Sequence, residues 1–432
     1  MMQVIKGDRA VCEAFIQRLK ERDEEKNRAV SQTVSDLIDR VRNEGDAAVR
    51  AFTQQFDGTA VERAELSREE IKAAAAHCDE AFLTALRNAA DRIRAFHARQ
   101  KQQSWFDTDA NGVLLGQRVR ALRRVGLYVP GGTAAYPSSL LMNAIPAKIA
   151  GVRELIMTTP PGKDGLPDDG ILAAALIAGV DRVFTMGGAQ AVAALAYGTE
   201  SVPKVDKVVG PGNIYVAMAK KQLYGVVDID MIAGPSEILV IADETANPKF
   251  VAADLLSQAE HDALASAVLL TTSACLAEAV CAELTRQTAV LSRREIIEKS
   301  LRDFSAVILC DSIPDAIAFS EELAPEHLEL CVANPMEYLG QIDNVGSVFM
   351  GNYTPEPVGD YYAGPNHVLP TGGTARFFSP LSVDCFVKKS QFVSYTKPAL
   401  AAARADIECL ARAEGLTAHA NAVSVRFEED AP

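Results

Sequence analysis

The spacing of apolar residues along the chain changes near residue 112. Before that point, residues 29–56 and 67–101 carry apolar side chains at nearly helical spacing, with charged residues on the opposite face. This spacing predicts two long helices, although Gly45 weakens the middle of the first one. Residues 1–110 are therefore expected to form an N-terminal helical segment with a structural role.

After residue 112, short β-branched runs alternate with Ala-rich runs. VGLYVP (125–130) and ELIMTT (154–159) have the composition of strands, and a run with helical character follows each of them. Such alternation is typical of βαβ units that build a parallel sheet. A second series of the same kind starts with EILVIAD (237–243), so the break between two modules falls near AGPSE (233–237).

These patterns predict an α/β fold with two Rossmann-like, incomplete and doubly wound parallel-sheet modules. The expected parts are the segment 1–110 packed on the second module, a first module 111–235, a second module 236–375 and a tail 376–432. Within the tail, FVKKSQFVSYT is strand-like and residues 398–415 form a helix that Gly415 ends. A further helix carries His419, and VSVRF is expected to be a strand.

Charge and cysteine content limit the possible partners and the compartment. The net charge of −14, from 43 basic and 57 acidic residues, disfavours nucleic acid or an anionic membrane as a partner. No apolar run reaches the roughly 18 residues needed to span a bilayer, and the first residues lack the apolar core of a signal peptide. The eight cysteines form no CxxC pair, which is typical of free thiols in a reducing compartment. We therefore expect a cytoplasmic protein.

Glycine-containing turns follow three strands of the first module. They are PGGTAAYPSS (130–139), MGGAQA (186–191) and VGPGNIY (209–215). Open α/β sheets bind ligands outside the carboxyl ends of their strands, where glycine lets the backbone approach a phosphate. The chain has neither G-x-G-x-x-G after a strand nor a P-loop sequence. The turns suggest a nucleotide or dinucleotide site, with plain strand-to-helix turns as the alternative.

Four of the six histidines lie in polar motifs in the second half of the chain: His261, His327, His367 and His419. Histidine is the commonest metal ligand and the usual proton carrier near neutral pH, so this concentration indicates one polar site assembled from distant segments. Gln258 and His261 are three residues apart in a helical run, which would place both on one face and let them share a metal. A surface histidine at a helix end is the alternative.

Two other segments carry an acid close to an imidazole. Glu326 and His327 are adjacent, and at the start of a strand they can serve as two separate proton carriers, with an exposed loop pair as the alternative. The loop GDYYAGPNHVLPT holds Asp360 and His367 and is a candidate binding loop because it is rich in polar groups.

The tail contributes a third pair of this kind. Glu414 and His419 flank Gly415, far along the chain from either module. Their composition matches that of the other two segments, which suggests that the tail returns to the site. It can do so in its own subunit or in a neighbouring one.

Five of these segments together closely resemble histidinol dehydrogenases. AGPSEILVIAD, DLLSQAEHD, LAPEHLEL, GDYYAGPNHVLPT and EGLTAHANA occur in the order in which that family has them, and the resemblance extends from about Val125 to Ala422. It implies oxidation of L-histidinol to L-histidine through L-histidinal, the last step of histidine biosynthesis. It also implies one Zn²⁺ per subunit and two NAD⁺ consumed per turnover.

The resemblance assigns a role to each polar residue by its position in the family's motifs. The zinc ligands would be Gln258, His261, Asp360 and His419, and His419 would serve the site of the other chain in an intertwined homodimer with shared sites. The catalytic acid–base pair would be Glu326 and His327. Ser236, His367 and Glu414 would contact L-histidinol, and the zinc ligands and the acid–base pair would contact it as well. Tyr128, Gln190 and Asn213 would contact NAD in the first module.

Two other functions remain open. A related zinc- and NAD-dependent dehydrogenase of another polyol or of a sulfonated diol would lose some substrate-side residues, whereas this chain keeps His367 and Glu414. A zinc-binding α/β protein without catalysis would have no need of both Glu326 and His327. Turnover of L-histidinol with NAD⁺ distinguishes the three.

Overall fold

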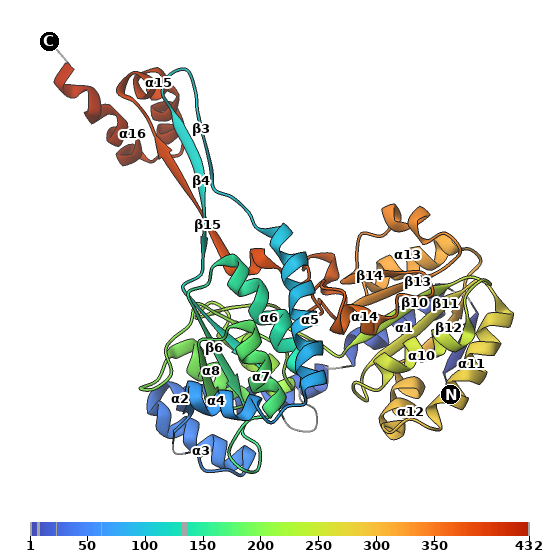
Figure 1. The fold of residues 1–432 in the computed structure, drawn as a ribbon. Coiled ribbons are helices and arrows are strands. Elements are labelled where there is room, and N and C mark those ends of the chain that lie inside the picture. The colour runs from blue at the N-terminus through green and yellow to red at the C-terminus, as the bar shows by residue number, and fades with distance from the viewer. Residues whose placement is uncertain (1, 7–8, 23, 62, 132–135, 431–432) are drawn as a thin grey trace. The chain divides into compact units, whose positions relative to one another are not determined.

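The computed structural model describes residues 2–6, 9–22, 24–61, 63–131 and 136–430 (Figure 1). It divides into two compact units, of which unit 1 contains residues 1–101 and 122–386 and unit 2 contains residues 102–121 and 387–432. Residues 132–135 of the expected glycine turn lie outside the described part. No helix within the described part is long and apolar enough to cross a membrane.

The first sheet of unit 1 has six strands. In spatial order they are β2 (Glu65–Leu66), β7 (Arg182–Thr185), β6 (Glu154–Thr159), β5 (Arg124–Tyr128), β8 (Lys207–Val209) and β9 (Asp228–Ile229). Neighbouring strands are parallel except for β2, which runs antiparallel to β7. The direction of winding reverses between β5 and β8, which makes this position a topological switch point of the kind at which open sheets bind ligands.

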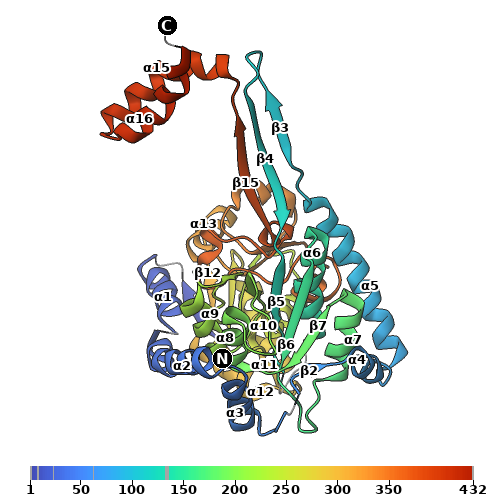
Figure 2. The ribbon, with the colours of Figure 1, turned by 90° about the vertical axis from the view of Figure 1, so that its left-hand side faces the viewer.

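Successive side chains of β5 face two separate cores. Leu127 packs with helices α4 (Arg68–Ala75), α5 (Glu80–His97), α6 (Pro137–Ala150) and α7 (Asp169–Ala178). Tyr128 packs with α2 (Glu24–Glu44), α3 (Asp46–Asp57), α8 (Gly188–Tyr197) and α9 (Ile214–Leu223). Because strand side chains alternate between the two faces, helices cover both sides of this sheet (Figure 2).

The second sheet of unit 1 also has six strands and repeats this strand order, but its edge strand is parallel to its neighbour. In spatial order its strands are β1 (Gln3–Lys6), β12 (Ala306–Leu309), β11 (Ser266–Thr271), β10 (Glu237–Ala242), β13 (His327–Cys331) and β14 (Ser347–Met350), and all are parallel. Helices α10 (Pro248–Ala259), α11 (Ala274–Thr288) and α12 (Arg294–Asp303) cover one face, and α1 (Arg9–Glu21) and α13 (Ile313–Leu323) cover the other. The prediction of an α/β fold with two parallel-sheet modules is therefore confirmed.

Short helical segments connect and follow these elements. Helix α14 (Glu356–Tyr361) comes after β14, and the 3-10 helices in the described part of unit 1 are Ala98–Gln100, Pro335–Glu337, Leu339–Gln341, Thr374–Arg376 and Val383–Phe386.

The N-terminal segment is divided between the two sheets. Strand β1 and helix α1 complete the second module, whereas α2 to α5 pack on the first sheet. The expectation that residues 1–110 pack on the second module is therefore wrong for most of the segment. The predicted helix 29–56 is interrupted at Gly45, whose φ is 57°, and the predicted helix 67–101 is divided into α4 and α5. Helical spacing identifies an apolar face, but it does not say which sheet that face covers.

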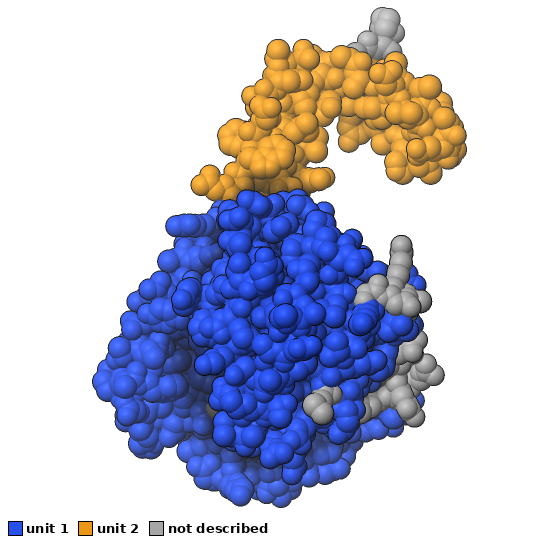
Figure 3. Space-filling view, turned by 90° about the vertical axis from the view of Figure 1, so that its right-hand side faces the viewer, with its two compact units in different colours: residues 1–101, 122–386 blue, residues 102–121, 387–432 orange. Residues whose placement is uncertain are grey.

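Unit 2, which is orange in Figure 3, contains an antiparallel three-stranded sheet and two α-helices within its described residues. Strand β4 (Leu114–Ala121) lies between β3 (Trp105–Thr108) and β15 (Val387–Ser394). Helix α15 (Lys397–Ala413) is joined to α16 (Thr417–Ser424) through Glu408, which accepts hydrogen bonds from Arg404, Arg412 and Ser424.

The structure of the tail corrects one expected strand. VSVRF is not a strand, because it continues from α16 into the 3-10 helix Val425–Asp430. The tail strand and the helix after it are confirmed as β15 and α15. Alternating apolar residues are common at a helix end, so a five-residue run could not distinguish the two states.

The turn after β8 requires glycine at position 210. Gly210 has a φ of +115°, and a Cβ atom there would overlap the backbone carbonyl of Tyr128. A buried ion pair between Lys220 and Asp230 lies beside the turn. The Asp230 carboxylate accepts a hydrogen bond from the Gly210 N–H at 2.8 Å, and Lys220 Nζ donates to the Gly210 carbonyl at 3.0 Å. This turn is therefore held in one conformation at the switch point of the first sheet.

We predict that Gly210→Ala lowers stability by more than about 3 kcal/mol, because strain at a positive φ alone costs about 1–3 kcal/mol and the overlap with Tyr128 adds to it. Gly225→Ala is the matched control, since Gly225 has a φ of +99° but a Cβ atom there would meet nothing within 4 Å. Denaturant unfolding of both variants measures the difference. Equal losses in the two variants would show that the contact with Tyr128 has no effect.

Candidate active site

The predicted catalytic residues lie at the amino end of the second sheet. His327 is the first residue of β13 and stands opposite Ile238 of β10, while Glu326 and Ser236 come just before their strands. Because β10 and β13 are parallel neighbours, the segments that precede them lie side by side. The two adjacent residues that sequence suggested as separate proton carriers therefore enter the site at the start of a strand, as predicted.

Both members of this pair are fixed by the backbone of Glu237. The Glu237 N–H donates to Glu326 Oε2 at 2.9 Å, and the Glu237 carbonyl oxygen lies 3.0 Å from His327 Nδ1. A carbonyl oxygen only accepts, so Nδ1 carries the imidazole proton and Nε2 is left with its lone pair. His327 Nε2 is buried, and no hydrogen-bond partner for it exists among the described residues. A neutral imidazole with an available Nε2 is the form required of a base.

Burial sets the charge of both groups. It lowers the pKa of His327 to about 3, so the ring is neutral near pH 7. Burial also raises the pKa of Glu326 well above its ordinary value, and the carboxylates of Glu237 and Asp360 raise it further. A cation bound nearby would favour the ionised form of Glu326, so the site is suited to positively charged ligands.

Helix α14 and the loop after it bring further polar side chains close to Glu326 and His327. His367 Nδ1 donates to the backbone carbonyl of Asp360 at 2.9 Å, and His367 Nε2 lies 3.1 Å from the hydroxyl of Ser139 in α6. Asp360 Oδ1 is 4.0 Å from His327 Nε2, and burial raises the pKa of Asp360 to about 6. His367 thus connects the second module's site to a helix of the first module.

Glu356 also belongs to this group, although the sequence reading did not select it. Within the described residues, ligand atoms of His327, Glu356 and Asp360 all lie within 4.8 Å of one another. Glu356 Oε2 also accepts a hydrogen bond from Ser257, the neighbour of Gln258, at 3.1 Å. The spacing of four residues between Glu356 and Asp360 would have indicated a shared helix face if PEPVGDY had been recognised as helical.

Gln258 is buried with its amide group unsatisfied. It is 0% exposed, and neither its oxygen nor its nitrogen has a hydrogen-bond partner in the described part of the chain. A buried amide without partners is costly, so this side chain fits a role as a metal ligand.

His261 lies beyond the helix rather than in it. Helix α10 ends at Ala259, and the His261 N–H donates to the Gln258 carbonyl at 3.1 Å in the following turn. Gln258 and His261 therefore do not share a helix face, and the prediction that they do is wrong. The side chain of His261 is exposed, and its charge lowers the pKa of both His327 and Glu356, which places it close to the same site.

Glu414 and His419 belong to unit 2. Glu414 is the C-cap residue directly after α15, and His419 lies within α16; both are exposed. The residues discussed above all belong to unit 1.

Of the three residues matched to NAD contacts, Tyr128 ends β5, whereas Gln190 lies in the first turn of α8 after β7 and Asn213 lies in the turn between β8 and α9. The Tyr128 hydroxyl accepts a hydrogen bond from the Gly188 N–H at 3.0 Å, and Asn213 caps α9 by accepting from two backbone N–H groups. Gln190 is 1% exposed, and both polar atoms of its side chain lack a partner among the described residues. Their contact with NAD stays a prediction, and it is made at the switch point where such ligands bind.

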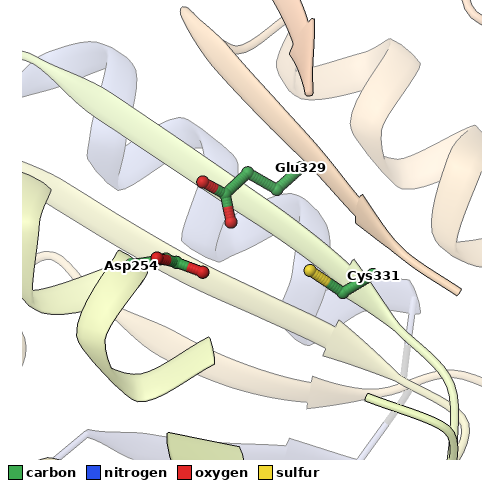
Figure 4. A group of neighbouring side chains, drawn as sticks. All are labelled: Asp254, Glu329 and Cys331. Atoms are coloured by element: carbon green, nitrogen blue, oxygen red, sulfur yellow. The ribbon is translucent and has the colours of Figure 1, made fainter. Parts of the chain in front are cut away.

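A second group of acids lies deeper in the second module. Asp254 of α10 and Glu329 and Cys331 of β13 point toward one another (Figure 4). Glu329 Oε1 accepts a hydrogen bond from the Glu356 N–H at 2.8 Å, and its carboxyl group also bonds to Asp254. Burial raises the pKa of Asp254 to about 6 and that of Glu329 well above its ordinary value. A proton shared by the two acids satisfies this pair, and Glu329 in turn fixes the start of α14.

We predict that Glu329→Gln stabilises the protein at pH 8 by about 1–2 kcal/mol, because glutamine keeps an acceptor for Glu356 and offers Asp254 a permanent donor. Because the pKa values of Asp254 and Glu329 are raised in the folded state, this state binds more protons than the unfolded state above about pH 4. The free energy of unfolding therefore falls as the pH rises through this range. The gain should therefore shrink at pH 4.5. Thermal unfolding at both pH values measures it, with Glu278→Gln on the exposed surface of α11 as control. A gain that does not depend on pH would contradict the shared proton.

Comparisons with known proteins show the family of this chain. The family model described as histidinol dehydrogenase matches residues 20–427. The chain is 55% identical over 428 residues to the histidinol dehydrogenase of Clostridium acetobutylicum, with 99% of each chain covered, and 53% identical over 429 residues to that of Bacillus cereus, covering 99% of this chain and 100% of the relative.

A solved structure supports the fold over the same length. The crystal structure of histidinol dehydrogenase from Elizabethkingia anophelis matches with a TM-score of 0.92 and 39% sequence identity, over 99% of this chain and 98% of that one. A family model across nearly the whole sequence and relatives at this identity leave no alternative family. The chain belongs to the histidinol dehydrogenase family.

Proposed function

We propose that this chain oxidises L-histidinol to L-histidine through L-histidinal, with two NAD⁺ reduced in succession. The observation that carries the proposal is the buried, neutral imidazole of His327 in a chain of this family. Its Nδ1 lies 3.7 Å from Glu326 Oε2, and its unpaired Nε2 lies 4.0 Å from Asp360 Oδ1. A dehydrogenase of another polyol or a sulfonated diol is disfavoured by the names of the relatives. A protein that binds zinc without catalysis is disfavoured by the retained acid–base pair.

In the first half-reaction, His327 Nε2 accepts the hydroxyl proton of L-histidinol while the hydride leaves for NAD⁺. The product is the aldehyde and NADH. The hydrogen bond from Nδ1 to the Glu237 carbonyl holds the ring in the required tautomer and stabilises the imidazolium that forms.

In the second half-reaction, Glu326 acts as the base. Its carboxylate takes a proton from a water molecule that adds to the aldehyde, and the hydrate then gives its hydride to a second NAD⁺. The hydride transfer leaves the carboxylic acid, which loses its remaining proton to solvent and becomes the carboxylate of L-histidine. The positive charge of the bound substrate favours the ionised form of Glu326, whose pKa burial would otherwise hold high.

The proposed metal is one Zn²⁺ per subunit, held by Gln258, His261, Asp360 and His419 of the partner subunit. Two imidazoles, a carboxylate and an amide oxygen form a nitrogen and oxygen donor set that zinc accepts. The unsatisfied amide of Gln258 fits this role. When bound, zinc would act as a Lewis acid that holds the nitrogen atoms of the substrate. Glu356 would orient Asp360 and α10 through its contacts with both.

The remaining contacts complete the proposal. Ser236, His367 and Glu414 would bind L-histidinol, and NAD would occupy the switch point of the first sheet through Tyr128, Gln190 and Asn213. Shared sites require a homodimer in which each tail serves the other subunit. The eight free cysteines suit the reducing cytoplasm, where we expect the enzyme to act.

We predict that His327→Gln slows oxidation of L-histidinol by about 10²–10⁴-fold, as expected when a general base is lost. Glu326→Gln should spare this step more than it spares oxidation of L-histidinal, because Glu326 acts on the water that adds to the aldehyde. Supplying the alcohol and the aldehyde separately, each with NAD⁺, measures the two rates. Equal losses for both substrates in both variants would rule out separate roles, and a wild-type protein inactive on L-histidinol would refute the proposed function.

We predict that two inactive variants restore each other's activity when their subunits exchange. His261→Asn and His419→Asn each remove one zinc ligand from every site of a homodimer, so both should lose tight zinc binding and activity. In a mixed dimer with shared sites, one site carries both changes and the other carries none. Activity should then return to about half of the wild-type value per dimer.

The control for this experiment is exchange itself, followed with a tag on one chain. If His419 serves its own subunit, every site in the mixed dimer keeps one altered ligand and no activity returns. Recovery of zinc in step with activity would support the shared ligand set, and complete exchange without recovery would exclude it.

A further inference from the structure

We propose that Arg22, at the end of the N-terminal helix α1, is a positioning residue for the acid–base pair Glu326 and His327. This inference rests on the proposed function. Arg22 directly follows α1, which packs on the second sheet, and its side chain is 2% exposed. It acts through Glu237, so the N-terminal helix becomes part of the support of the active site.

Arg22 fixes the segment that leads into β10. Its Nη2 donates to the Pro235 carbonyl at 3.0 Å and to Glu237 Oε1 at 2.9 Å. The other carboxylate oxygen of Glu237 accepts a hydrogen bond from the Gly372 N–H at 3.2 Å. The Glu237 side chain is therefore held at both oxygens, by residues that are far away in the sequence.

The backbone of Glu237 carries this constraint to the catalytic pair. Its N–H donates to Glu326 and its carbonyl accepts from His327 Nδ1, at 2.9 and 3.0 Å. The two backbone groups belong to one residue, so a change in its φ or ψ turns them relative to each other. A shift of Glu237 would therefore displace the carboxylate of Glu326 and the ring of His327 together.

The ion pair is needed because Glu237 is buried. Its side chain is 3% exposed, and burial raises the pKa of its carboxyl group while the charge of Arg22 opposes that rise. Removing one partner of a buried ion pair leaves the other without compensation. The Glu237 side chain must then take up a proton or turn toward another donor, and in both cases its hold on the segment changes.

The test compares Arg22→Met, Arg22→Lys, Glu237→Gln and the double variant Arg22→Met/Glu237→Gln. Arg22→Met and Glu237→Gln should each lower kcat on the order of 10²-fold for both the alcohol and the aldehyde, because misplacement of catalytic groups has effects of this size. Arg22→Lys should retain more activity, since it keeps the charge. The double variant should lose no more than the worse single variant, because both changes break the same contact.

A second measurement does not depend on turnover. Hydrogen exchange of the peptide that contains Glu237 should be faster in Arg22→Met, because the Glu237 N–H bond to Glu326 loosens. Arg18→Met is the matched control, since Arg18 lies on the exposed side of the same helix and should leave kcat and exchange unchanged.

Several results would overturn the proposal. One is a kcat of Arg22→Met within twofold of wild type in folded, zinc-loaded protein. Another is a double variant in which the losses of kcat from the two single changes multiply. The third is hydrogen exchange of the Glu237 peptide in Arg22→Met that is no faster than in Arg18→Met. If Arg22→Met does not fold, the same measurements are made on Arg22→Lys and on the double variant Arg22→Met/Glu237→Gln, in which neither residue is charged. A wild-type protein inactive on L-histidinol would contradict the proposed function, and hydrogen exchange would still decide the role of Arg22.

Discussion

The parallel pairing of β10 with β13 is the constraint on which the site depends. It places Glu237 beside Glu326 and His327, so the backbone of one strand orients the two side chains at the start of the next. Helix α10 leaves the carboxyl end of β10 and returns to the amino end of β11, and this brings Gln258 to the same edge. The polar groups of unit 1 therefore meet because of strand order, although they are distant in the sequence.

This edge concentrates buried acids to an unusual degree. Glu237, Glu326, Glu356 and Asp360 are all shielded from water, and burial raises the pKa of each of them. Such a cluster reduces stability when its members ionise, unless cations compensate the charge. Arg22 compensates Glu237 within the chain. The other three acids face the proposed binding site of a metal ion and a cationic substrate. Their charges would lower the stability of the free protein and raise its affinity for these cations.

The strands of both modules and the polar motifs could be predicted because each depends on local sequence. VGLYVP and EILVIAD are strands in the structure, and Glu326 and His327 lie together at the start of β13. Strand β1 was missed because four residues at a chain end have little pattern of their own, and the pairing with β12 decides their state. The hairpin of β3 and β4 was missed because β3 has only 4 residues and both strands are largely exposed, so neither carries a buried apolar run.

Other features depend on tertiary structure alone. Glu356 and Arg22 carry no motif, and their importance comes from contacts with residues far along the chain. His261 matched a helical spacing, yet the helix ends two residues earlier, because capping is decided by the turn into β11. Sequence located the chemistry well, whereas the groups that hold it in place became visible only in the folded chain.

The edge position of β1 has a consequence for the order of assembly during synthesis. Gln3 of β1 pairs with Ala306 of β12, so β1 leaves the ribosome long before the strand with which it pairs. Until then, Phe15, Ile16 and Leu19 of α1 have no sheet to cover and remain open to wrong contacts. The first module lies entirely between these two strands in the sequence and can fold during the wait. Strand β1 and helix α1 can therefore dock on the second module only after β12 has been made, and Arg22 reaches Glu237 at that late step.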